Sequence, residues 1–260
     1  MKRLIAGLFG LALAALTGQA AQADAFEDIL KKGVVRIATP LDVPPMGSQN
    51  EKREAEGFDI DLANMVAKAL GVKLEMQQVT GANRIPFLIT NKVDIVISVM
   101  GLTPERAKQI MFTAPYADTQ LAVFGPKALA VTSADTVGTH KIAAAKGTTQ
   151  ELALTAMNPK AQIMRTEDDA TAAAAYLSGQ AELFATNTLL IPDMQKRNPS
   201  KEFEMKFSIR RSPAHMGVRM GEHNLVRWLD SFIFFNTMNG ELDRLHQKWL
   251  GMKMAPLPSL

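Results

Sequence analysis

DIVISVMGLTPER, residues 94–106, contains the transition that decides the fold of this chain. It begins with an apolar run, which is typical of a strand buried on both faces of a parallel sheet. Thr103 then suits the N-cap of a helix and Pro104 its first position, so the spacing predicts a helix directly after the strand. A strand that leads into a helix is the repeating unit of α/β folds.

The same alternation continues along the chain. Strands are predicted at 33–39, 72–79, 141–145, 161–166, 181–187 and 214–220, and helices at 57–71, 83–92, 147–157, 167–179, 188–198, 224–238 and 240–250. Strands separated by helices predict parallel α/β sheets, and the two successive blocks predict two lobes. The C-terminal helices follow the second block, and we expect them to return to the first lobe.

The N-terminus has the pattern of an export signal. Lys2 and Arg3 precede an uncharged run over 4–16, and an A-x-A cleavage pattern occupies 21–23. The apolar run is too short to span a bilayer well, so a cleaved signal fits better than a membrane anchor. We therefore predict cleavage between Ala23 and Asp24 and a periplasmic mature protein.

Charge and cysteine content exclude several classes of function. Without Lys2 and Arg3, 27 basic residues face 26 acidic ones, so the basic whole-chain balance gives no support for nucleic-acid binding. The chain has no cysteine, which excludes disulfides and thiolate metal sites. Its four histidines are far apart, without metal-binding spacing. We expect no metal and no cofactor.

The opening stretch has the features of half an anion site. Ligands of parallel α/β sheets bind beyond the carboxyl ends of the strands, where Ser98 and Gly101 lie. The helix that Thr103 caps directs its first N–H groups toward that edge, and Arg106 in its first turn can hold a carboxylate with two parallel bonds. The same residues also fit a well-capped helix with a surface arginine, and the bare pattern does not separate the two.

A second stretch, KIAAAKGTTQEL at 141–152, supplies the other half. It also has a strand, a glycine and a capped helix start, with Thr148 and Thr149 at the cap. One strand end and one helix N-terminus in each lobe would form a cleft that could enclose a small, partly anionic solute.

Five segments carry a family resemblance. They are GFDIDLANMVAKAL, NRIPFL with NKVDIVIS, TPERAKQIMFTAPY, KGTTQE and GELDRLHQKWLG. With these in order over essentially the whole mature chain, the sequence resembles the family 3 extracellular solute-binding proteins, periplasmic receptors of ATP-binding-cassette importers for polar amino acids.

The resemblance implies an α/β, two-lobe periplasmic-binding-protein fold of type II with two hinge crossovers and a cleft between the lobes. The expected division is a signal peptide at 1–23, lobe 1 at 24–118, lobe 2 at 119–211 and the returning part of lobe 1 at 212–260. It also implies a monomeric, non-enzymatic receptor that binds a small solute and docks on a membrane permease.

The resemblance further implies roles for single residues. Arg106 would bind the ligand α-carboxylate, the 98–103 segment would line the cleft, and Thr148 and Thr149 would donate from lobe 2. Three positions depart from the family: Gly101 replaces a hydroxyl residue, Val43 replaces an aromatic, and Asn187 replaces an aspartate that pairs with the α-ammonium.

Arg84 and Asn187 bear on ligand charge. Arg84 in NRIP either reaches a second carboxylate, as in receptors for acidic amino acids, or lies on a helix surface, and the sequence leaves both open. A cleft with Arg84 and Arg106 but no acid at Asn187 favours a net negative ligand. If the ligand is a cation instead, Asp42 is the candidate to hold its ammonium.

An enzyme on the same scaffold is the main alternative, since periplasmic dehydratases of prephenate-like acids resemble this chain. That chemistry needs a carboxylic acid held protonated in the cleft. Asn187 cannot provide one, and Glu167, Asp168, Asp169 and Glu182 are expected at helix starts or on the surface. A signalling receptor is a third possibility, but no kinase or cyclase pattern supports it.

Overall fold

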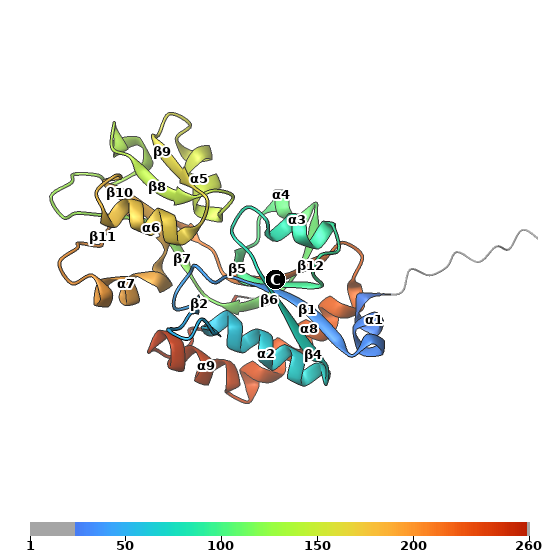
Figure 1. Cartoon of the computed structure of the whole chain (residues 1–260). Coiled ribbons are helices and arrows are strands. Elements are labelled where there is room, and N and C mark those ends of the chain that lie inside the picture. The colour runs from blue at the N-terminus through green and yellow to red at the C-terminus, as the bar shows by residue number, and fades with distance from the viewer. Residues whose placement is uncertain (1–23, 259–260) are drawn as a thin grey trace, which may run out of the picture.

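Two five-stranded sheets organise residues 24–258, which are the residues that the computed structural model describes (Figure 1). The first sheet has the order β4 (Lys73–Gln78), β1 (Val34–Thr39), β5 (Ile95–Gly101), β12 (Ala214–Arg219), β6 (Ile110–Ala117). The second has the order β11 (Glu204–Arg211), β7 (Gln120–Gly125), β10 (Leu183–Asn187), β8 (Ile142–Ala145), β9 (Ile163–Thr166). Each sheet with its helices is one lobe, lobe 1 and lobe 2. The predicted signal peptide lies outside the described residues.

Helices cover both faces of each sheet. Lobe 1 contains α1 (Ala25–Lys32), α2 (Phe58–Leu70), α3 (Arg84–Ile89), α4 (Pro104–Ala107), α8 (His223–Met238) and α9 (Glu241–Leu250), and the short ribbon β2 (Ser48–Gln49) and β3 (Ala55–Glu56). Lobe 2 contains α5 (Thr149–Met157), α6 (Asp169–Leu177), α7 (Ile191–Arg197) and the 3-10 turns η1 (Ala134–Val137) and η2 (Thr188–Leu190). In Figure 1, α2, α8 and α9 lie on one side of the first sheet and α3 and α4 on the other. No helix within 24–258 has both the length and the apolar character needed to cross a bilayer.

The central strands are buried because their sequences are mostly apolar. All residues of β8 and β10 are buried, and β5 is buried except at Val99. The edge strand β4, which alternates charged and apolar residues, is largely exposed. Burial on both faces makes β5 and β10 the fixed centres from which the site residues project.

Both sheets are mixed, whereas the sequence pattern predicted parallel ones. β12 runs antiparallel to β5 and β6, and β7 runs antiparallel to β10 and β11. The helix that starts at Pro104 is a single turn, because β6 begins at Ile110 and pairs with β12. Pairing with a strand about a hundred residues away overrides the local helix signal there.

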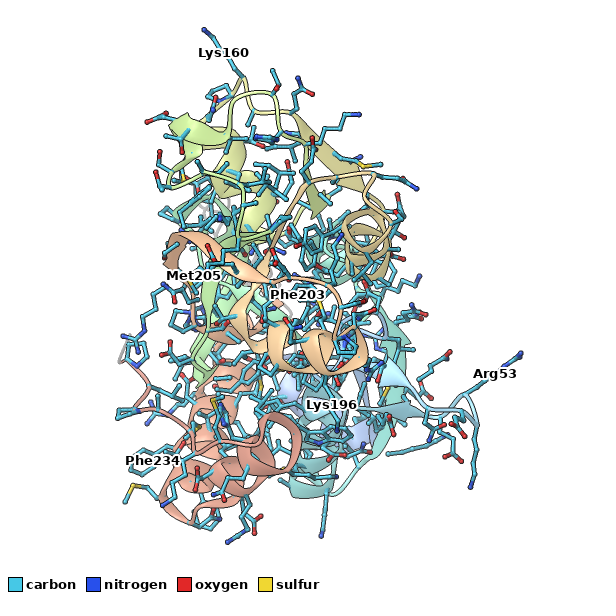
Figure 2. All side chains as sticks on the ribbon, turned by 90° about the vertical axis from the view of Figure 1, so that its left-hand side faces the viewer. Arg53, Lys160, Lys196, Phe203, Met205 and Phe234 are labelled. Carbon is cyan, nitrogen blue, oxygen red and sulfur yellow. The ribbon has the colours of Figure 1, made fainter. Side chains whose placement is uncertain are left out.

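The chain crosses between the sheets twice, and the two crossings are bonded to each other. β6 leads to β7 through Asp118 and Thr119, and β11 leads to β12 through Ser212 and Pro213. The Ser212 N–H donates to the Thr119 carbonyl at 2.8 Å, so the two connections lie side by side. Figure 2 shows the lobes end to end, with Lys160 at the tip of lobe 2 and Phe234 near the far end of lobe 1. Paired short connections between two lobes are the usual structure of a hinge.

Candidate functional site

Two adjoining cavities lie where the lobes meet. The smaller has a volume of about 20 Å³ and is lined by residues of both lobes. Four of the predicted site residues line it: Arg84, Thr148, Thr149 and Asn187. The larger has a volume of about 540 Å³, and its lining includes Arg84, Thr103, Arg106, Thr149 and Arg210 beside the apolar Ile85, Met100 and Leu152. The smaller cavity holds about one molecule of the size of water, so an amino acid fits there only after the lobes separate.

Arg106 joins the lobes across the cleft. Its side chain is 6% exposed, and its backbone N–H donates to Thr103 Oγ1, the N-cap of α4. Its guanidinium donates to the Gly101 carbonyl at 2.7 Å in lobe 1, and to Thr149 Oγ1 at 2.8 Å and the Gly147 carbonyl at 3.0 Å in lobe 2. The alternative of a surface arginine is therefore excluded, and a fork of donors is fixed inside the cleft.

Burial and two nearby arginines disfavour the charged form of Arg106. Burial, with smaller contributions from Arg84 and Arg210, lowers its pKa to about 10. The group stays cationic near neutral pH, but within 24–258 no carboxylate is found in an ion pair with it. A buried cation of this kind is stabilised by an anion that accepts hydrogen bonds from its N–H groups.

Arg84 is buried too, so of the two alternatives it does not lie on a helix surface. It is 5% exposed at the start of α3, lines both cavities, and donates from Nε to Ser98 Oγ at 3.0 Å. Ser98, at the end of β5, is thus engaged by Arg84. Burial raises the pKa values of Asp42, Asp59 and Asp169, and the positive charge of Arg84 opposes that rise in each.

Asp169 corrects one expectation. The sequence predicts it at a helix start or on the surface, and it is indeed the first residue of α6. It is only 6% exposed, however, and it lines the smaller cavity. Burial raises its pKa to about 7, while Arg84 opposes that rise. Asp42, in the loop after β1, accepts from the Asp169 N–H at 2.9 Å, and burial raises its pKa as well. Each lobe therefore contributes one acid, which reduces the excess of positive charge expected from Arg84 and Arg106.

Asn187 ends β10 and lines the smaller cavity, as the sequence predicted. Its Oδ1 accepts from the Leu189 N–H at 3.0 Å and so caps η2. That oxygen is already engaged by the backbone, which leaves Asn187 a weak partner for an ammonium group.

Thr148 and Thr149 have different roles. The Thr148 hydroxyl caps α5 and donates to the Ala145 carbonyl at 2.7 Å, so its polar capacity is used locally. The Thr149 hydroxyl accepts from Arg106. Of the two, Thr149 is the one whose hydroxyl bonds across the cleft.

Two glycines of lobe 1 allow the lobes to meet. A Cβ on Gly101 would overlap Ser212 Oγ and lie 3.0 Å from Thr149 Oγ1. A Cβ on Gly81 would lie 2.7 Å from Thr148 Cγ2 and 2.8 Å from the Lys146 carbonyl. The absent hydroxyl at Gly101 is therefore a steric requirement of closure.

Val99 lines the smaller cavity in an unfavourable conformation. Its φ is 43°, in the left-handed region that β-branched residues rarely adopt. Its N–H is held by Asp59 Oδ2 at 3.1 Å and Tyr116 Oη at 2.9 Å, and Tyr116 also donates to Asp59 Oδ1. Such strain persists only where the surroundings impose it, and it is concentrated at functional sites.

The sequence analysis did not predict several of the lining residues: Thr119, Gln150, Asp169 and Ser212. Of these only Asp169 carried a usable signal, a pair of acids at a predicted helix start. Within 24–258, no group of three or more His, Cys, Asp or Glu could hold a metal ion.

Comparison with known proteins gives one family. The family described as "Bacterial extracellular solute-binding proteins, family 3" matches residues 35–252. The ABC transporter glutamine-binding protein GlnH of Bacillus subtilis is 28% identical over 76% of this chain and 73% of its own length. Cyclohexadienyl dehydratase of Pseudomonas aeruginosa is 26% identical over 96% of this chain and 94% of its own.

A solved structure supports the same relationship. The ancestral amino acid-binding protein AncCDT-1, a precursor of cyclohexadienyl dehydratase, has a crystal structure that is 31% identical in sequence to this chain. The match covers 87% of this chain and 99% of that chain, with a TM-score of 0.79.

Proposed function

Because the chain belongs to the family 3 bacterial extracellular solute-binding proteins, we propose that it is a receptor for an ATP-binding-cassette importer. It captures a small carboxylate-bearing solute, an amino acid or a derivative of one. Relatives such as the glutamine-binding protein of Bacillus subtilis are receptors of this class. The proposal includes export to the periplasm, removal of residues 1–23, a monomeric state and docking on a membrane permease.

The single observation that carries the proposal is the position of Arg106. Its guanidinium lies between the lobes with donors directed to Thr149 and to the Gly147 carbonyl. A carboxylate that enters the opened cleft would take the place of these neutral acceptors and form two charge-assisted bonds, which are stronger. Ligand binding in the cleft and closure of the hinge are thereby linked.

The test is a thermal-shift panel of the standard amino acids, amines and dicarboxylates, followed by calorimetry on each hit. A ligand present at about 100 times its dissociation constant should add ~2.7 kcal/mol to the free energy of unfolding. If no carboxylate-bearing solute shifts the transition and none gives heat on titration, the receptor function is wrong.

The second candidate is a dehydratase of prephenate- or arogenate-like acids, and one observation favours it. Asp169 is a buried cleft acid with a pKa of about 7, which is the property that a general acid needs. The proposal of a non-enzymatic receptor predicts that purified protein gives no turnover of prephenate or arogenate above the solution rate. Turnover that Asp169→Asn abolishes would instead support the enzyme.

A further inference from the structure

Two acids lie at the smaller cavity without an ion pair to any described residue: Asp169 lines the cavity, and Asp42 accepts from the Asp169 N–H next to it. Asp42 Oδ1 is buried and has no hydrogen-bond partner within 24–258. The carboxyl oxygens of Asp169 accept no hydrogen bond from any described residue, although Asp169 is only 6% exposed. Thr119 lines the same cavity, and its Oγ1 is also buried without a partner among the described residues. Polar atoms left in this state are costly unless something else bonds to them.

Arg84 does not satisfy these acids. Its guanidinium bonds to Ser98, and no ion pair between it and either carboxylate is found in the described part of the chain. It also acts on Asp59, so one cation faces three carboxyl groups. One positive charge offsets at most one of them.

We propose that Asp42 and Asp169 together bind a positively charged nitrogen of the ligand, with one carboxylate contributed by each lobe. The inference rests on the proposed receptor function and narrows its ligand to carboxylates that carry an α-ammonium group. The pair takes the role that Asn187 cannot fill, because the Asn187 amide oxygen already caps η2.

The arrangement also gives a reason for closure. Asp42 follows β1 in lobe 1 and Asp169 starts α6 in lobe 2, and they approach closely enough for Asp42 to accept from the Asp169 N–H. When both are ionised they repel one another, and Asp168 beside them adds to the negative charge. A cation between them replaces repulsion with two attractions, so the closed form is favoured with that ligand and not with a ligand that lacks the charge.

The groups that face the pair are Arg84 from α3 and Asp168 from the start of α6. Both acids have pKa values above their ordinary range before a ligand is bound. A bound cation favours their ionised forms, so binding should release protons near neutral pH. A purely structural role for the pair would not produce that release.

The experiment is isothermal titration calorimetry on the full mature chain with three matched pairs of probes. They are L-glutamine with glutaramate, L-glutamate with glutarate, and L-arginine with 5-guanidinopentanoate. The members of each pair differ in the α-ammonium group. The variants are Asp169→Asn and Asp42→Asn, with Glu167→Gln as a charge-matched control on the exposed approach to α6. Folding of each variant is checked by its melting temperature, and Asp169→Asn should melt no lower than the wild type.

We expect the best amino acid to bind the wild type at least about 100-fold more tightly than its deaminated partner, as loss of a buried charge partner predicts. Asp169→Asn should reduce that ratio to within about 10-fold, Glu167→Gln should preserve it, and titrations in buffers of different ionisation enthalpy should reveal proton release. Equal affinity for both members of the pair, or full affinity in Asp169→Asn, would overturn the inference while the receptor function stands. If neither these probes nor any solute of the thermal-shift panel binds, the receptor function and the inference are refuted together.

Discussion

Replacing Arg106 by alanine removes a side chain that bonds to both lobes across the cleft. Two of its bonds, to Thr149 at 2.8 Å and to the Gly147 carbonyl at 3.0 Å, cross between the lobes. A ligand carboxylate exchanges these for two charge-assisted bonds of about 1.5–3 kcal/mol each. Since the exchanged bonds also involve the charged guanidinium, the net loss in Arg106→Ala should be near the lower end, about 3 kcal/mol. That corresponds to a weakening of the dissociation constant by about 100-fold or more.

Lysine at the same position supplies a sharper version of the test. Arg106→Lys keeps the charge but loses the planar fork, so it should restore binding only in part. Burial lowers the pKa of Arg106 from 12.5 to about 10. The same shift on a lysine would give a pKa of roughly 8. Affinity of the lysine variant should therefore fall as the pH rises through that value, while wild-type affinity stays constant there.

Calorimetry from about pH 7 to pH 9 measures both effects with whichever solute the panel identifies. Lys108→Ala is the matched control, because Lys108 is exposed two residues further along and its loss changes the net charge equally. Unchanged affinity in Arg106→Ala, or an equal loss in Lys108→Ala, would refute the assignment of Arg106 as the carboxylate anchor.

Three further outcomes test closure and the buried acids. Saturating ligand should keep or reduce the radius of gyration of the wild type in small-angle scattering. In Gly81→Ala the added Cβ would lie 2.7 Å from Thr148 Cγ2, so this variant should have a larger radius and bind about 10-fold or more weakly, as overpacking predicts. A radius and affinity equal to those of the wild type in Gly81→Ala would contradict the prediction. Asp59, buried and with a pKa raised to about 7, stabilises the fold fully below about pH 4, and that contribution is lost as the pH rises through about 7. Urea unfolding should therefore show a loss of at most about 4 kcal/mol over that range in the wild type and a smaller one in Asp59→Asn; parallel profiles would argue against a charged Asp59. Because Asn has a single acceptor oxygen, it cannot accept from both the Val99 N–H and the Tyr116 hydroxyl, so the variant should also be less stable near about pH 5, by ~1–2 kcal/mol.

The sequence by itself determined the α/β class, most of the elements and the two helix starts that face the cleft. Apolar runs such as 94–101 and capped starts at Thr103 and Thr148 are local patterns, and local patterns are sufficient for elements whose burial is continuous. The same local reasoning made Arg106 a candidate, because a cap, a strand end and an arginine occur within a few residues, but it did not separate a cleft arginine from a surface one.

Only the tertiary structure decided which acids enter the site. A first-turn aspartate such as Asp169 normally caps a helix in solvent, and nothing near it in the sequence indicates that Asp42 would accept its N–H from the other lobe. The direction of β6 and β12 was decided in the same way, by pairing between segments about a hundred residues apart. Burial and charge in the cleft depend on contacts between the lobes, and such contacts have no periodicity in the sequence from which they could be predicted.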